Sequence, residues 1–219
     1  MYGVIVGDIV NSRSIDNEVR NEITLQAKDT FERINSEYSD CLLAQFSMVR
    51  GDSFEGVLSK RYSSATKIVQ DIIKAFYRVE RTVVRICIAL GELSFVSSTL
   101  NETDGPAFHK AVDILTMMKK TGNSHWLQVS IDINGIESPL IHSYMELLSA
   151  LTRRWSDKQR EVVWAVQENK GYQKAVGEKF GIAYSVVSRQ LKVANYEIYC
   201  NAWDNLTEYL TRIEGNRVS

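Results

Sequence analysis

The stretch LLAQFSMVRGDSFEGVL, residues 42–58, has the pattern of two strands joined by a tight turn. Apolar and aromatic residues occupy both flanks, and Gly51 stands at the turn, where a hairpin favours glycine. Apolar residues at helix-face spacing precede this stretch at about 17–38 and follow it at about 62–80. The hairpin is therefore expected to lie between two helices.

Two further apolar runs, at about 2–7 and 82–93, predict strands on the outer sides of these helices. The resulting order is βαββαβ, which usually folds as an antiparallel sheet with its helices on one face, the ferredoxin-like or palm arrangement. In that arrangement the first and third strands are neighbours that run in opposite directions. A helix opened by Gly105-Pro106 and a strand at about 126–133 extend the unit.

The pattern changes after Asn134-Gly135, because no strand signal returns. Ser138-Pro139 is typical of a helix start, and the residues Ser156-Asp157-Lys158-Gln159 form a capping-box pattern that opens another helix. We therefore predict an α+β protein with two domains, an α/β domain over residues 1–137 and a helical domain over residues 138–219.

The helical part contains a helix-turn-helix pattern over residues 156–195. Gly177 is small where two helices would cross, and Gly181 stands where the first helix ends in the left-handed region. The second helix is expected to expose a polar face suited to base edges and phosphates. The predicted DNA-binding residues on this face are Ser185, Ser188, Arg189 and Lys192. The alternatives are an ordinary three-helix cluster and a protein-interaction module.

The last helix carries an apolar stripe at steps of four and three residues. The stripe consists of Ile198, Ala202, Leu206, Leu210 and Ile213. It can pack within its own chain or against a second copy. A homodimer would present two recognition helices to a two-fold DNA site.

Bulk composition favours a cytoplasmic protein. The chain shows no secretory signal pattern and no apolar run of the roughly 20 residues needed to cross a bilayer. Its three cysteines are far apart, which favours reduced thiols over a disulfide framework. Residues 1–150 carry 15 basic and 19 acidic residues, whereas residues 151–219 carry 11 and 8. The basic second part is compatible with nucleic-acid binding.

Two carboxylates are expected at neighbouring strand ends. Asp8 follows the first strand and Asp52 precedes the third, so the antiparallel order brings them together. Paired carboxylates repel each other, and Mg²⁺ bound with phosphate oxygens is a usual compensation. The sequence therefore predicts Asp8 and Asp52 as metal ligands, with Mg²⁺ as the cofactor. Aspartates at strand ends and in turns also occur for reasons of turn geometry alone.

Four motifs, in their order and spacing, resemble the class III nucleotidyl cyclase domain. They are VIVGDI (4–9), VRGD (49–52), VRICIALGE (84–92) and GPAFHKA (105–111). The resemblance covers roughly residues 1–135 and implies that Asp8 and Asp52 match the metal-binding aspartates of the cyclases. It also implies that such a site tends to form between two chains.

A closer resemblance is to the SatD family, whose members join a cyclase-like domain to a C-terminal helix-turn-helix. It rests on GDIVNSR (7–13) with RGDSFEG (50–56) and on the helical pattern near the C-terminus. Three positions depart from the cyclase pattern. The transition-state Asn and Arg are replaced by His109 and Asp113, and the base-selecting Lys by Met48. An aspartate cannot stabilise developing phosphate charge, so cyclisation of a nucleotide is not expected.

A phosphate-bearing ligand is expected beside the first strand. The predicted nucleotide-binding residues are Asn11, Ser12 and Arg13, on the loop that enters the first helix, and Arg50 in the hairpin turn. The leading hypothesis is a DNA-binding regulator whose first domain binds a nucleotide or a metal–nucleotide complex as a signal. The alternative is an enzyme, a Mg²⁺-dependent nucleotidyl transferase or cyclase of altered chemistry. The sequence leaves open whether the chain is an enzyme.

Overall fold

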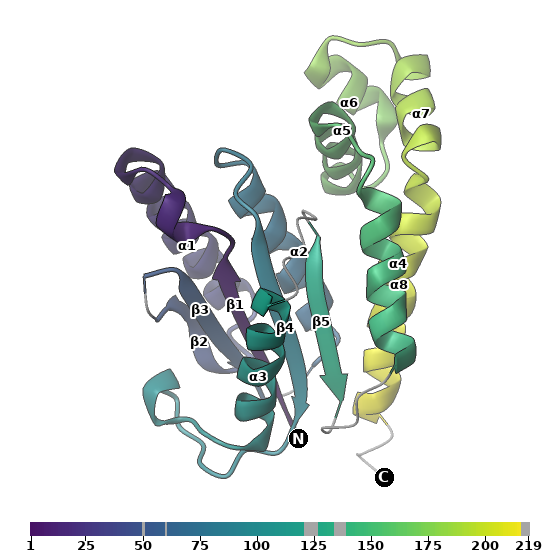
Figure 1. Cartoon of the computed structure of the whole chain (residues 1–219). Helices are drawn as coiled ribbons and strands as arrows, with labels where there is room; N and C mark the ends of the chain where they lie inside the picture. The colour runs from purple at the N-terminus through teal and green to yellow at the C-terminus, as the bar shows by residue number, and fades with distance from the viewer. Residues whose placement is uncertain (50, 60, 121–126, 134–138, 216–219) are drawn as a thin grey trace.

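The computed structural model describes residues 1–49, 51–59, 61–120, 127–133 and 139–215 (Figure 1). In chain order the strands are β1 (Tyr2–Ile9), β2 (Leu42–Met48), β3 (Ser53–Leu58), β4 (Val84–Gly91) and β5 (Gln128–Ile133). The helices are α1 (Asn17–Glu37), α2 (Ser64–Tyr77), α3 (Pro106–Lys120), α4 (Pro139–Thr152), α5 (Asp157–Glu168), α6 (Gln173–Phe180), α7 (Tyr184–Val193) and α8 (Tyr196–Gly215), with short 3₁₀ turns η1 (Ser12–Ser14) and η2 (Leu100–Glu102). Each element expected from apolar periodicity is present, with shifted ends.

The five strands form one sheet in the order β2-β3-β1-β4-β5. β1 is antiparallel to both β3 and β4, and β2 is antiparallel to β3. The prediction that the first and third strands are antiparallel neighbours is confirmed. β5 runs parallel to β4, and α3 supplies the crossover that a parallel connection requires. The protein is thus α+β, with the strand order of a ferredoxin-like unit extended by β5.

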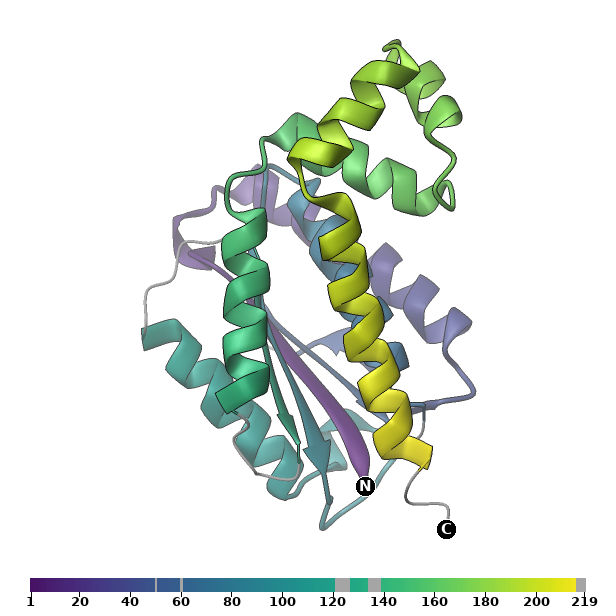
Figure 2. The same cartoon turned by 90° about the vertical axis from the view of Figure 1, so that its right-hand side faces the viewer.

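One face of the sheet, here called the helix-rich face, is covered by α1, α2, α4 and α8 (Figures 1 and 2). Four phenylalanine rings form its centre, with centroids 5.5–6.2 Å apart. They are Phe31, Phe46, Phe54 and Phe76. A Cβ on Gly7 would lie 2.2 Å from the Phe54 ring, so this ring packs directly on the backbone of β1.

The opposite face, here called the α3 face, carries smaller side chains. Ala107, Ala111 and Leu115 of α3 pack on Val4, Val6, Ala44, Val57, Cys87 and Ala89 of the sheet. α3 lies in front of the sheet in Figure 1, across from α1 and α2. In the described part of the chain, this face also bears buried polar groups, Asp8, Gln128 and Asp132 among them.

The helices after the sheet belong to the same hydrophobic core as the helix-rich face. α4 and α8 lie side by side over that face, whereas α5, α6 and α7 form a cluster beyond one end of the sheet (Figure 2). The Tyr144 hydroxyl donates a hydrogen bond to the Ala202 carbonyl at 2.6 Å, which joins α4 to α8. The sheet and the helices are therefore held together by shared packing.

The apolar stripe of α8 is partly buried within its own chain, with Ala202 and Ile213 half-buried. Trp203, Leu206 and Leu210 are buried against the rest of the protein, whereas Ile198 is 58% exposed. The predicted domain boundary between residues 137 and 138 lies outside the described residues, and the two-domain division stays a prediction. Among the described helices, none has the length and apolar character needed to cross a membrane.

Candidate functional site

The end of β1 meets the β2–β3 turn. The Ile9 backbone N–H donates to the Asp52 carbonyl at 3.0 Å, and Asp8 stands opposite Ser53 in the β1–β3 register. Gly51 has φ of +65°, which glycine adopts without strain, and the turn is closed by a bond from Val49 N to Ser53 O at 2.8 Å. The predicted proximity of Asp8 and Asp52 along the two strands is thus confirmed for the backbone.

The Asp8 side chain is buried, at 2% exposure, and is held by two cations. Arg85 faces it directly in the β1–β4 register and donates from Nε to Oδ1 at 3.0 Å and from a terminal nitrogen to Oδ2 at 3.1 Å. Lys119, in the last turn of α3, places its Nζ 3.1 Å from Oδ2. Both carboxylate oxygens of Asp8 are therefore engaged.

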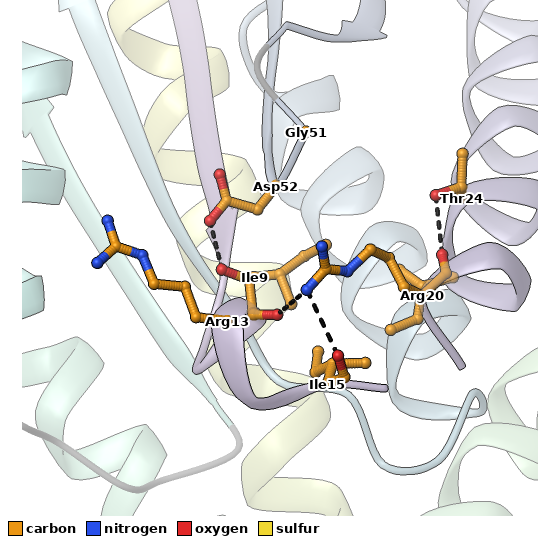
Figure 3. Close-up of a pocket in the computed structure, with 9 residues that line it drawn as sticks. Ile9, Arg13, Ile15, Arg20, Thr24, Gly51 and Asp52 are labelled. Carbon is orange, nitrogen blue, oxygen red and sulfur yellow. Dashed lines mark hydrogen bonds between the residues drawn. The ribbon is translucent and has the colours of Figure 1, made fainter. Parts of the chain in front are cut away.

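The Asp52 side chain has different surroundings. Its carboxylate accepts a hydrogen bond from the Ser12 hydroxyl at 2.5 Å. It also lines a cavity of about 200 Å³ between the β1–α1 loop, α1 and the hairpin turn (Figure 3). This loop cavity is lined by Ser12, Arg13, Arg20, Thr24 and Asp52 together with Ile9, Ile15, Ile23 and Gly51. Asp8 is not among its lining residues.

The β1–α1 loop has a defined shape. Asn11 adopts the left-handed conformation with φ of 55°, and η1 follows it. The Arg20 guanidinium donates to the Ser12 carbonyl at 2.9 Å and to the Ile15 carbonyl at 3.4 Å, as Figure 3 shows, so α1 fixes the loop from behind. The α1 N-terminus is capped by Asp16, which accepts from the Val19 N–H at 3.0 Å. An anion at this loop would meet the η1 turn, because the first turn of α1 already has a carboxylate.

These side chains do not fit the shared metal site that the sequence predicts. A cation bridging two carboxylates needs both of them on one cavity. Here Asp52 lines the loop cavity, while Asp8 faces Arg85 and Lys119 on the α3 face. In the described ranges, no group of three or more acidic, histidine or cysteine side chains is placed to hold a metal ion. Mg²⁺ ligation by Asp8 and Asp52 stays a prediction.

The positions that depart from the cyclase pattern lie away from Asp8. His109 is exposed in the first turns of α3 and pairs with Asp104 at 2.7 Å. It precedes Lys119 by ten residues, which is about 15 Å along a helix. Met48 packs against the core of the helix-rich face. Arg50, the remaining predicted nucleotide-binding residue, lies outside the described residues.

A buried thiol lies on the same face as Asp8 but is unsuited to nucleophilic chemistry. Burial raises the pKa of Cys87 far above its usual range, nearby Asp132 raises it further, and Lys110 lowers it. The thiol therefore stays protonated at neutral pH, and a protonated thiol is a poor nucleophile. The cysteines Cys41 and Cys200 are free as well.

The α6–α7 pair has the geometry expected from its glycines. Gly181 ends α6 with φ of +62°. A Cβ on Gly177 would lie 2.7 Å from the Ile182 carbonyl oxygen, so the turn packs directly against α6. Of the four residues predicted on the outer face of α7, Ser185, Arg189 and Lys192 are exposed and Ser188 is half-buried.

The acidic residues of α5 are paired with arginines at the end of α2. Arg78 lies 3.4 Å from Glu161 and 3.0 Å from Glu168. Arg81 lies 2.6 Å from Asp157, whose pKa is lowered by its hydrogen bond from Arg160. This side of the helical cluster is therefore close to electrically neutral.

The opposite charge balance holds for α6 and α7. Residues 169–193 contain a single acidic residue, Glu178. Their basic residues are all exposed, and we call them the basic surface: Lys170, Lys174, Lys179, Arg189 and Lys192. None of these five forms an ion pair with any residue that the structure describes. The outer part of the cluster is thus a surface of uncompensated positive charge.

Two residues of the site were not found from the sequence, Lys119 and Arg20. Lys119 belongs to a Lys-Lys pair at a helix end, a pattern typical of a solvated surface. Only the crossover from β4 to β5 brings it to Asp8. Arg20 lies at an exposed position of α1. Its bonds to the Ser12 and Ile15 carbonyls depend on how the preceding loop folds, so the sequence pattern does not show them.

Two nucleotide cyclases are among the solved structures that match the chain. A bacterial light-regulated adenylyl cyclase matches with a TM-score of 0.39 and 13% identity, over 54% of this chain and 40% of that chain. The catalytic core of a rhodopsin-guanylyl cyclase with converted specificity, in complex with ATPαS, matches with a TM-score of 0.40 and 18% identity, over 60% of this chain and 76% of that chain. The present chain thus spans well under two thirds of the first of these proteins. Among curated proteins, none matches the chain.

A family model gives a match along most of the sequence. The model of the SatD family matches residues 2–210, from the first strand to the last turns of α8. That span includes the Asp8–Arg85–Lys119 cluster, the loop cavity and the basic surface. Because the match extends over nearly the whole chain, the protein belongs to the SatD family.

Proposed function

We propose that this protein is a DNA-binding regulator, in which α6 and α7 form a helix-turn-helix that contacts DNA and the loop cavity binds a nucleotide or another phosphate-bearing ligand. The observation that carries the proposal is the basic surface, five exposed cations with one acidic residue in the same stretch. DNA carries a dense array of phosphates, and neutralising them releases bound counterions, which supplies much of the affinity.

The charge asymmetry of the helical cluster supports a DNA partner. The acidic residues of α5 are paired with Arg78 and Arg81, which follow the end of α2. Because these acidic residues are already paired, they do not neutralise the positive charge of the basic surface. A surface of one sign attracts a polyanion from a distance of about a Debye length, roughly 8 Å at physiological salt.

The outer face of α7 supports its role as the recognition helix. Ser185, Arg189 and Lys192 are spaced by four and three residues and are exposed together. Arginine donates to guanine edges in the major groove, and serine and lysine donate to phosphates. The buried residues of the same helix, Val187 and Leu191, attach it to the core and leave this face open.

The β1–α1 loop supports the ligand half of the proposal. A left-handed residue followed by a single helical turn, as at Asn11 and η1, is a backbone conformation that gathers N–H groups around an anion. Arg13 lines the loop cavity and is exposed, so its guanidinium is accessible to a phosphate. The loop and the α5–α7 cluster lie toward the same end of the sheet (Figures 1 and 2).

The geometry gives less support to the enzyme hypothesis. Asp8 is engaged by Arg85 and Lys119, and His109 and Asp113 stand on other turns of α3. No reaction step is therefore assigned to this chain.

DNA binding is tested by fluorescence anisotropy with a random duplex over a series of salt concentrations. Each phosphate contact contributes about −0.9 to the slope of log K against log salt, so several contacts give a steep slope. Arg189→Ala is expected to weaken binding by about 1–3 kcal/mol if the side chain contacts a base. Lys28→Ala is the matched control, because Lys28 is 71% exposed but lies on α1 beside Glu32.

Three results would contradict the DNA proposal: no binding at low salt, binding without a salt slope, or equal affinity for Arg189→Ala and the parent. The oligomeric state, measured by light scattering with and without duplex, tests the predicted homodimer. A dimer that binds one two-fold duplex is the expected form.

A further inference from the structure

We infer that this end of the sheet binds its phosphate-bearing ligand without a divalent cation. Arg85 and Lys119 already occupy both carboxylate oxygens of Asp8, and Asp52 is the one carboxylate among the described residues that line the loop cavity. This inference rests on the ligand half of the proposed function. It names the chemical class more sharply: the ligand is a free anion such as a metal-free nucleoside phosphate.

The Arg85–Asp8 contact is built into the sheet. The two residues are direct partners in the β1–β4 register, so their side chains share one face and meet without any loop rearrangement. The guanidinium is 13% exposed and contacts both carboxylate oxygens. Such a two-point arginine–carboxylate contact is among the stronger ion pairs in proteins.

Lys119 completes the cluster from the other side of the α3 face. Its Nζ lies 3.1 Å from the same Oδ2 that Arg85 contacts. A metal ion on Asp8 would have to displace one or both cations. The displaced guanidinium would then be buried without a partner, which is a large free-energy cost.

The net charge around the end of β1 points the same way. The charged residues that line the loop cavity are Arg13, Arg20 and Asp52, so its described lining carries a net charge of +1. Asp8 lies outside that lining and is paired with Arg85 and Lys119. A phosphate is therefore attracted to the cavity directly, without a cation between them.

The first test uses stability in EDTA and needs no nucleotide. Removing one of two mutually repelling metal ligands stabilises a metal-free protein, whereas removing an ion-paired carboxylate destabilises it. We expect Asp8→Asn to lower the Tm by roughly 6–20 °C for a chain of this size. Asp29→Asn, an exposed change on α1, is the matched control and should leave the Tm within about 1 °C. A Tm that rises for Asp8→Asn would overturn the inference.

The second test uses the wild-type protein, so it holds even if Asp8→Asn fails to fold. Mn²⁺ binding is measured by electron paramagnetic resonance, with Mn²⁺ as a probe for Mg²⁺. We expect no stoichiometric site at millimolar Mn²⁺, and a stoichiometric Mn²⁺ site in the wild-type protein would overturn the inference.

The third test compares thermal shifts with ATP in EDTA and with ATP in Mg²⁺. The same or a larger shift in EDTA is expected, and a shift that requires Mg²⁺ would refute the inference. If ATP shifts the Tm in neither medium, the proposed nucleotide site is refuted. The Tm of Asp8→Asn and the Mn²⁺ titration then still decide whether Asp8 is ion-paired or binds a metal ion.

Discussion

The two faces of the sheet differ in what they bury. The helix-rich face buries four phenylalanine rings under α1, α2, α4 and α8. The α3 face buries small side chains and charged groups under one described helix. Large apolar area contributes most to stability, whereas buried charges contribute little net stability but are sensitive to loss of a partner. The comparison teaches that the large aromatic packing and the buried Asp8–Arg85 ion pair lie on opposite sides of one sheet.

The largest expected effect is on the helix-rich face. Phe54→Ala should lower the free energy of unfolding by about 3–5 kcal/mol, because Phe54 is fully buried and contacts two other rings. Val6→Ala on the α3 face should cost about 2 kcal/mol, since it removes two methyl groups. Urea unfolding measures both changes. Equal losses would remove the contrast in apolar packing between the faces.

The second prediction concerns the buried ion pair between Arg85 and Asp8 on the α3 face. Arg85→Met should destabilise the protein by about 3 kcal/mol, because it leaves the buried Asp8 carboxylate with Lys119 alone. Arg33→Met is the matched control, since the Arg33 side chain is half exposed and its pairs with Glu37 and Asp71 should together be worth about 1 kcal/mol or less. Urea unfolding of the two variants gives the comparison. A change at Arg85 as small as that at Arg33 would show that the α3-face charges are solvated.

The smallest effect concerns a single buried cation under the helix-rich face. Burial lowers the pKa of Lys74, with Asp71 partly opposing that shift. Because the unfolded chain holds this proton more tightly, the cost of charging Lys74 is fully present at neutral pH. That cost is lost as the pH rises toward 10.5, the ordinary lysine value. Lys74→Met should therefore stabilise the protein by about 1 kcal/mol at pH 7 and by less near pH 10.

The measurement is urea unfolding of Lys74→Met and parent protein at both pH values. Lys67→Met on the same helix is the control, because Lys67 is 61% exposed and should change stability by less than about 0.5 kcal/mol. A gain for Lys74→Met that is the same at pH 7 and pH 10 would mean that the benefit comes from packing and not from the removed charge.

Local patterns predicted the elements and much of the topology. Gly51 marked the hairpin, the Ser156–Gln159 capping box opened α5 as expected, and Gly181 ended α6. These signals are local because each depends on the backbone of a few neighbouring residues. How far the α8 stripe is buried within its own chain depends on the tertiary fold. Helix periodicity alone therefore did not distinguish packing within the chain from packing against a second copy.

The site was less predictable than the fold. Asp52 lies in the turn before β3, outside the in-and-out alternation of the strand, so strand periodicity did not tell which way its side chain points. Asp8 and Arg85 meet through the β1–β4 register, and Lys119 meets them through the α3 crossover. Neither relation is visible in the spacing of residues along the chain. Charge partners of this kind require the three-dimensional structure.

The Asp8–Arg85–Lys119 cluster has a consequence for how such a chain can change by mutation. Losing Lys119 alone leaves Arg85 bound to both oxygens of Asp8, and losing Arg85 alone leaves the carboxylate with Lys119, whose side chain is 45% exposed. A free carboxylate at this position therefore needs both basic residues to change, and the first change reduces stability before the second gives any benefit. Variants with one of the two basic residues changed are therefore less stable intermediates between sequences with this cluster and sequences with an unpaired carboxylate at the end of β1.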